Sequence, residues 1–175
     1  LLSSALFLVP FGRIADIAGR KRIFTLGLSL FIAASFGMAL TVIPATIVPL
    51  RVVQGMGGAL IYGTAVAILT AVTPPAGRGK ALGIYTTAVY LGLSLGPFLG
   101  GFMTGSLGWR SIFLVNILLG IFALWLVARR LPGEGAGARG EGFDGPGALL
   151  YGLSLVSVML GFTWLPAPRG GLMIL

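Results

Sequence analysis

The chain has 175 residues, of which 57% are hydrophobic and only 9% are charged, and its mean hydropathy is +1.03. So few polar residues cannot cover so much apolar surface in a soluble domain, so lipid is the expected solvent for most of the chain. The net charge of +8 does not indicate nucleic acid, because the twelve basic residues are spread over short breaks between apolar runs. The absence of Cys and His excludes disulfides and most zinc, haem or iron–sulfur sites, and we expect no metal and no cofactor.

Apolar runs long enough to cross a bilayer divide the chain. A spanning helix needs about 20 apolar residues. The period-two alternation of barrel strands is missing, so the expected fold class is all-α, a polytopic helical membrane protein. Both ends of the sequence are apolar, and we expect the chain to be a fragment of a longer protein. The runs predict a partial span at 1–12 and full spans near 23–42, 46–72, 80–103, 110–129 and 146–166.

The basic residues divide unevenly between the breaks. Nine of them fall in three alternate breaks, at 13–22, 73–80 and 129–145. These breaks would lie on one side of the membrane, whereas Arg110 and Arg169 would lie on the opposite side. Short loops rich in Lys and Arg stay in the cytoplasm. We therefore expect these three loops to be cytoplasmic in a multi-pass membrane protein.

Composition also predicts three parts. Residues 1–130 hold the first group of helices, 131–147 form a Gly-rich polar connector, and 148–175 hold one further helix and an apolar end. The connector sequence is typical of a flexible linker.

The first basic break carries a patterned motif, GRIADIAGRKRIF. Glycine permits a tight turn and a close approach of helices. An Asp among cations can pair locally or point at a helix N-terminus. A contact of that kind, formed in one conformation and broken in another, would make the loop a switch rather than a binding site. The residues at fixed offsets are Gly12, Asp16, Gly19, Arg20 and Lys21.

One apolar run contains an arginine. A charge within a membrane segment is costly and usually faces a cavity or a partner. The alternative is snorkelling, because Arg51 lies only about five residues from the start of its span. The nearby Gln54 and its neighbouring glycines favour a functional role. At helical spacing one face carries Arg51, Gln54, Gly55, Gly58 and Tyr62.

A later run, AVYLGLSLGPFLGGFM, repeats small residues every fourth position. This spacing lets two membrane helices touch backbone to backbone. Proline removes a backbone donor and should bend the helix. The residues concerned are Gly92, Gly96, Pro97, Gly100 and Gly101.

These motifs together resemble those of the major facilitator superfamily, and within it the fourteen-helix drug:proton antiporters. GRIADIAGRKRIF is similar to the loop motif after helix 2, IVPLRVVQGMGGA to the helix-4 motif, and GLSLGPFLGGFM to the helix-5 antiporter motif. GWRSIFLVNILLG resembles the start of helix 6, and FDGPGALLYGL the start of helix 7. The resemblance covers nearly the whole chain in the family's order. One departure is Ile17, where the family often has Arg.

The resemblance implies a secondary transporter that works by alternating access, exporting small lipophilic or cationic drug-like compounds in exchange for protons. It implies that the loop residues Gly12, Asp16, Gly19, Arg20 and Lys21 form a cytoplasmic latch. It implies that Arg51, with Gln54 and Gly55, couples to proton movement. It also implies that the helix-5 glycines and Pro97 form a tightly packed interface. Helix 1 and the C-terminal half would lie outside this chain.

Three alternatives remain at this point. The same scaffold could export a natural metabolite, a lipid or a siderophore, and no residue separates these from drugs. A polytopic membrane enzyme is disfavoured, because the chain offers no His, no Cys and no evident carboxylate pair, so no catalytic residue is expected. The 175 residues alone could also be an inert truncated scaffold, since alternating access needs two halves.

Overall fold

The computed structural model describes residues 2–131 and 144–163, and all regular structure in these ranges is helical. Short 3-10 turns at Pro44–Thr46 and Pro75–Gly77 join some of the helices. By length and composition, α2 to α6 can cross a membrane, which confirms the expected all-α fold and the five full spans. The helices are α1 (Leu2–Ala18), α2 (Arg20–Leu40), α3 (Ile47–Val72), α4 (Arg78–Leu107), α5 (Arg110–Arg130) and α6 (Gly145–Thr163). Most of the predicted connector, 132–143, and the apolar end, 164–175, lie outside the described residues.

The first helix is longer than predicted. The expected partial span ended at residue 12 and a loop followed at 13–22, but α1 continues to Ala18 and α2 begins at Arg20. Arg, Ala and Ile in this stretch are tolerated or favoured in a helix, so charge marks the membrane boundary here rather than the helix end. Only Gly19 separates the two helices, with a φ of 104° that a side chain would strain. The predicted loop is therefore a sharp corner, defined here as residues 16–21.

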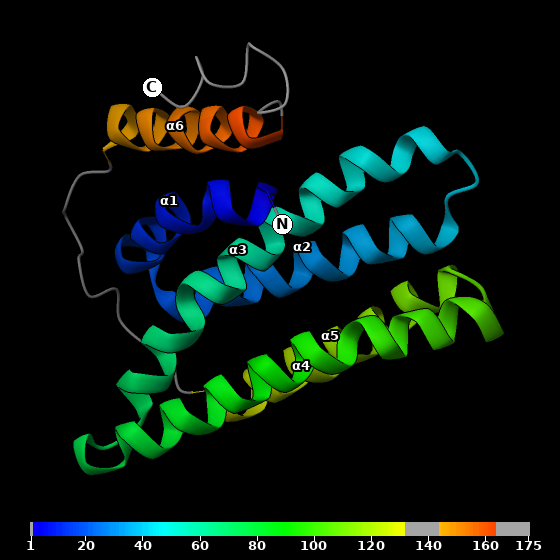
Figure 1. Ribbon diagram of the computed structural model, residues 1–175. Coiled ribbons are helices and arrows are strands. Elements are labelled where there is room, and N and C mark those ends of the chain that lie inside the picture. Colours follow the sequence, from blue (N-terminus) through cyan, green and yellow to red (C-terminus); the bar gives the residue numbers. More distant parts are fainter. Residues whose placement is uncertain (1, 132–143, 164–175) are drawn as a thin grey trace.

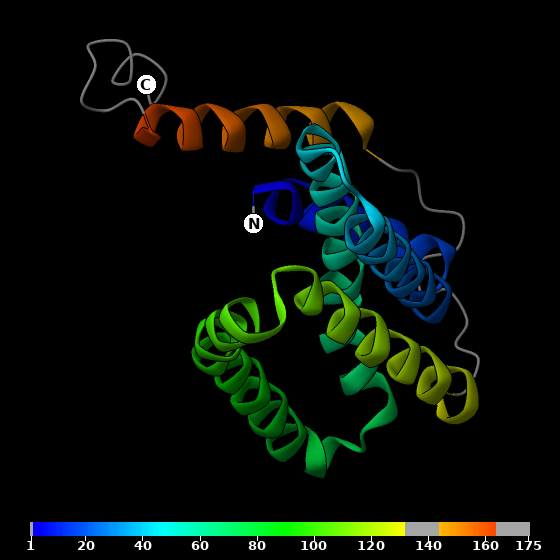
Figure 2. The same ribbon diagram turned by 90° about the vertical axis from the view of Figure 1, so that its right-hand side faces the viewer.

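The helices pack around a pair formed by α2 and α3 (Figure 1). Helix α1 lies against α3 on one side, and α5 lies against α2 on the other. Helix α6 packs beside α1, while α4 contacts mainly α3 and α5 and stands apart from α1 and α2 (Figure 2). Most of the buried residues accordingly belong to α2 and α3, and α4 has none.

Glycines allow the two central helices to approach closely. A Cβ added at Gly57 would lie 2.8 Å from the carbonyl oxygen of Gly27 and 2.8 Å from the backbone nitrogen of Phe31. A Cβ added at Gly27 would lie 2.7 Å from the Cβ of Leu60. Because backbone atoms cannot move aside, only glycine fits this contact. We call this contact the α2–α3 seam.

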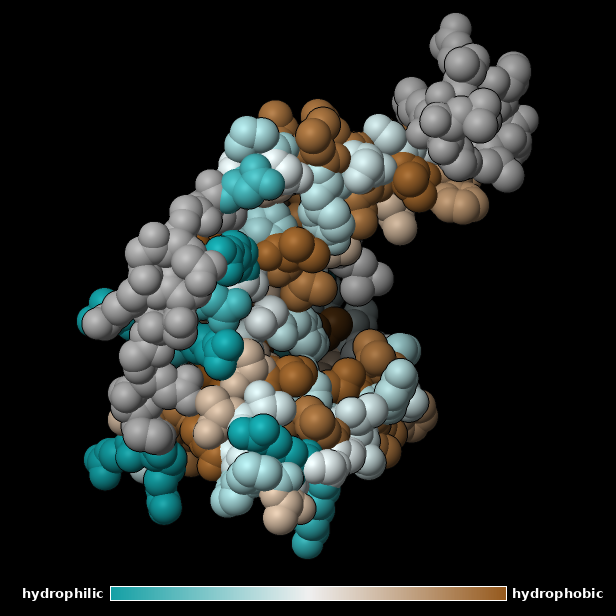
Figure 3. Space-filling view, turned by 90° about the vertical axis from the view of Figure 1, so that its left-hand side faces the viewer, coloured by the Kyte–Doolittle hydropathy of each residue, from teal (hydrophilic) through white to brown (hydrophobic). Residues whose placement is uncertain are grey.

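The three basic breaks meet at one end of the bundle. The corner after α1, the turn between α3 and α4, and the end of α5 all lie at the left of Figure 1. Figure 3 looks onto this end, and hydrophilic side chains gather over it. The Lys21 ammonium donates to the carbonyl oxygen of Leu131 and so joins the start of α2 to the end of α5. The arrangement agrees with the predicted grouping of the basic breaks on one side of the membrane.

A glycine-to-alanine exchange tests the α2–α3 seam. Gly57→Ala should lower the free energy of unfolding by about 1–3 kcal/mol, because the added methyl collides with backbone of α2. The measurement is the thermal midpoint of the detergent-solubilised protein. Gly105→Ala is the matched control, since a Cβ there meets nothing within 4 Å. Equal midpoints for the two variants would contradict the close seam.

Candidate functional site

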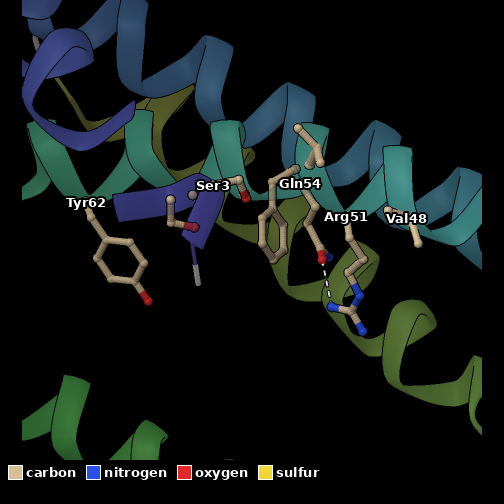
Figure 4. A pocket seen from close by; sticks show the side chains of 10 residues that line it. Ser3, Val48, Arg51, Gln54 and Tyr62 are labelled. Atoms are coloured by element: carbon tan, nitrogen blue, oxygen red, sulfur yellow. Dashed lines mark hydrogen bonds between the residues drawn. The ribbon is translucent and has the colours of Figure 1, made fainter. Parts of the chain in front are cut away.

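A pocket of about 370 Å³ opens where α1 and α2 meet the first half of α3 (Figure 4). Its wall is mainly apolar, and its polar groups are two hydroxyls from α1 and the side chains of Arg51, Gln54 and Tyr62. The face predicted from helical spacing is thereby confirmed, because all five of its residues line the pocket. The lining residues are Ser3, Ser4, Phe31, Val48, Arg51, Val52, Gln54, Gly55, Gly58 and Tyr62.

Two contacts within the bundle hold the arginine. The Arg51 Nη1 donates to the Gln54 Oε1 at 2.9 Å, one helical turn along α3. The guanidinium carbon also lies 5.0 Å from the centroid of the Phe113 ring, which α5 supplies. A guanidinium over an aromatic face is attracted by the negative centre of the ring. These contacts favour the pocket-lining interpretation of Arg51 over snorkelling.

Two further residues, Ser35 and Phe113, belong to the site without any signal in the sequence. The Gln54 Nε2 donates to the Ser35 Oγ at 2.9 Å, across the α2–α3 seam. Phe113 is 3% exposed and makes an edge-to-face contact with Trp109 at 5.9 Å. A lone serine or phenylalanine in an apolar run gives no local signal, since its partner lies on another helix.

The glycines of the pocket face let α1 approach α3. A Cβ at Gly55 would collide with the Ser3 hydroxyl, and a Cβ at Gly58 would lie 3.5 Å from the Ser4 hydroxyl. Further along α3, a Cβ at Gly63 would lie 3.6 Å from the Cα of Gly12. Gly12 therefore lies inside α1 at a close helix contact, rather than in a loop.

The corner holds the predicted ion pair. The Asp16 Oδ1 accepts from the Arg20 Nε at 3.0 Å and from Nη2 at 2.9 Å. Asp16 thus pairs locally, which was one of the two expected alternatives. Both side chains are about one-third exposed, so the pair itself adds little stability. The corner and the pocket are separate sites, because Arg51 lies near the opposite end of the bundle.

The glycine row of α4 faces open space within the described residues. A Cβ added at Gly92, Gly96 or Gly101 would meet nothing within 4 Å, and one at Gly100 would only reach a side chain of α5 at 4.0 Å. The helix continues through Pro97. The described part of the chain therefore does not contain a packing partner for this row, and the predicted tight interface stays a prediction.

Carboxylates are scarce and lie away from the pocket. The described ranges contain Asp16, at the corner, and Asp144, whose Oδ1 accepts from the backbone N–H of Gly147 at 2.9 Å. This bond caps the start of α6. No group of three or more His, Cys, Asp or Glu that could hold a metal occurs in these ranges.

Cysteine labelling tests whether water reaches the pocket. The chain has no Cys, so Val52→Cys introduces a single thiol on the pocket wall. A water-soluble maleimide should label it in the membrane-embedded protein. Phe36→Cys is the matched control, because Phe36 is exposed on α2 but lies outside the pocket lining, on a face we expect to meet lipid. Equal labelling of both thiols would show that the pocket is no more hydrated than the outer surface.

Comparison with known proteins agrees with this architecture. Curated relatives include the riboflavin transporter RibZ of Clostridioides difficile, 33% identical over 86% of this chain and 33% of its own length. The multidrug resistance protein Stp of Mycobacterium tuberculosis is 35% identical over 86% of this chain and 28% of its own length. The cephamycin export protein CmcT of Amycolatopsis lactamdurans is 39% identical, over 86% and 31% respectively. The chain thus spans about a third of the length of these relatives. The family model of the Major Facilitator Superfamily matches residues 1–169, and the chain belongs to this superfamily of integral, multi-pass membrane proteins.

Proposed function

We propose that this chain belongs to a proton-coupled exporter of small lipophilic or cationic compounds, working by alternating access. The observation that carries the proposal is Arg51, a charge in a membrane helix held at the wall of a pocket by Gln54 and Phe113. A charge in that position belongs to a water-filled pathway or a coupling site. Relatives named for multidrug resistance and for cephamycin export support export over uptake.

The chain would supply one half of the transporter, residues 1–130, then the connector 131–147 and the first helix of the remainder, within a protein of its relatives' size. We place that protein in a prokaryotic inner membrane, with the basic end of the bundle in the cytoplasm. The open glycine row of α4, with Pro97, would pack against a helix of the other half. Gly12, Asp16, Gly19, Arg20 and Lys21 would form a latch at the cytoplasmic end. The 175 residues alone would be inert.

A second candidate function is export of a natural metabolite, a lipid or a siderophore. The relative named as a riboflavin transporter favours it. The pocket wall is mostly apolar and would suit an apolar metabolite as well as a lipophilic drug. The two functions differ in substrate and share the machinery described above.

Proton release on addition of a compound tests the proposal. The full-length protein in inverted vesicles, with an acidic interior, should raise the internal pH when a lipophilic cation is added. Arg51→Ala should lower this signal by at least about tenfold, because the coupling charge is lost, and Arg51→Lys should keep part of it. Arg110→Ala removes a matched arginine that lies outside the pocket lining and should keep the signal.

The outcomes separate the candidates. No pH signal with any lipophilic cation, but a signal with riboflavin-like metabolites, would favour the second function. Equal signals from wild type, Arg51→Ala and Arg51→Lys would reduce Arg51 to a snorkelling side chain and remove the main support for coupling at this site.

The latch is tested at the corner. Asp16→Asn should lower the transport rate by about five- to tenfold while leaving membrane insertion intact, because it removes the ion pair with Arg20 and so shifts the balance between two states. Insertion is measured by the yield of monodisperse protein, and transport in the same vesicles. Asp144→Asn is the matched control, since Asn also caps a helix start. A wild-type rate in Asp16→Asn would leave the corner as a topology signal alone.

A further inference from the structure

We propose that Ser35 is a positioning residue for Arg51: its hydroxyl fixes the orientation of the Gln54 amide, which then presents an acceptor to the guanidinium. The inference rests on the proposed coupling role of Arg51. It adds a residue on a second helix to the site.

The Ser35 hydroxyl points along its own helix. Ser35 is 0% exposed on α2, and its Oγ donates to the carbonyl oxygen of Phe31 at 2.7 Å. A serine hydroxyl has a single hydrogen. With that hydrogen engaged in its own helix, the Ser35 oxygen can serve its remaining neighbour only as an acceptor.

Ser35 in turn determines the orientation of the Gln54 amide. Gln54 is 6% exposed, and the nitrogen of its side-chain amide lies 2.9 Å from the Ser35 Oγ. Because Ser35 can only accept, the amide must turn its NH₂ group toward α2. The carbonyl Oε1 then faces the other way, where the Arg51 Nη1 donates to it at 2.9 Å. The opposite orientation would set acceptor against acceptor at Ser35 and donor against donor at Arg51.

Ser35, Gln54 and Arg51 form a hydrogen-bonded relay that holds the guanidinium in place. Gln54 holds one edge of the guanidinium, and the Phe113 ring lies 5.0 Å from its carbon. Both partners are neutral. Among the described residues that line the pocket, Tyr62 is the other titratable group and no carboxylate is present. The relay therefore fixes the position of the positive charge without neutralising it.

The test compares two buried hydroxyls in the full-length protein reconstituted in proteoliposomes. Ser35→Ala should lower proton-coupled transport by about tenfold, because the buried NH₂ of Gln54 loses its acceptor on α2 and only Arg51 still orients the amide. Substrate exchange at equal pH on both sides, which needs no proton coupling, should stay near the wild-type rate. Ser35→Thr keeps the hydroxyl and should keep coupling.

Thr64 provides the matched control. It is 1% exposed on α3, and its hydroxyl donates only to carbonyl oxygens of its own helix, those of Leu60 at 2.7 Å and Ile61 at 3.2 Å. Thr64→Val removes a buried hydroxyl of the same kind outside the relay and should leave the coupling ratio unchanged. An equal loss of coupling in Thr64→Val and Ser35→Ala would overturn the positioning role, because removal of any buried hydroxyl would then lower coupling.

A double variant separates positioning from packing. If Ser35 acts through Gln54, then Ser35→Ala should add no further loss of coupling in a Gln54→Leu background. Additive losses would overturn the relay. If Ser35→Ala does not insert, Ser35→Cys serves the same cycle, because a thiol fills the site but is a weak hydrogen-bonding group.

The result also distinguishes this inference from the function on which it rests. Loss of coupling in Arg51→Ala with wild-type coupling in Ser35→Ala would overturn the positioning role alone. Wild-type coupling in Arg51→Ala would overturn the coupling role of Arg51 and the positioning role with it. Loss in both, with a non-additive double variant, is the expected result.

Discussion

The α2–α3 seam is the constraint on which the rest of the structure depends. Contact between apolar side chains contributes little free energy in a bilayer, because the lipid around them is equally apolar. Membrane helices therefore associate where small residues let their backbones approach. Positions four apart on α2 meet positions three apart on α3, the combination of rows expected for helices that cross at a shallow angle. The register that packs the glycines therefore also brings a serine hydroxyl to a buried amide. The successive contacts are Gly27 with Leu60, Phe31 with Gly57, and Ser35 with Gln54.

The neighbouring helices complete the site from either side of this pair. Helix α1 brings Ser3 against Gly55 and closes one wall of the pocket, while α5 brings the Phe113 ring under the guanidinium. Helix α5 is itself placed by a second close glycine, because a Cβ at Gly120 would lie 2.6 Å from the Cγ1 of Ile32 on α2. Helix α4 contacts α3 and α5 but contributes no buried residue to this packing. The described helices thus divide into a closely packed group and one helix whose small residues face outward.

Local spacing explains what could be predicted. The spans follow from the length of the apolar runs, and the lengths of the helices confirm them. The pocket face of α3 follows from helical periodicity, and its five residues do line one pocket. The charge at 13–22 predicts a loop, but Arg and Ala are compatible with a helix and continue α1 to Ala18. Ser35 could not be predicted, because a serine in an apolar run usually bonds to its own helix, and Ser35 does that too. Its second partner depends on the register with α3, which no local pattern contains.

Arg51 is the only charged residue of α3, and the nature of its partners decides what it can do. A buried carboxylate partner would neutralise it and would be costly to separate, so the helix would tend to stay in one state. The partners in the described bundle are an amide oxygen and an aromatic ring, which hold the guanidinium in place and leave its charge directed at whatever occupies the pocket. The electrostatic energy of Arg51 therefore depends on the pocket's contents, whether a substrate, water or a proton-carrying group. Differential energy of that kind between two occupancy states is what allows one binding event to drive another. Within the described residues, neutral groups hold the charge of Arg51 and no carboxylate lines its pocket, which is the arrangement that the proposed coupling role requires.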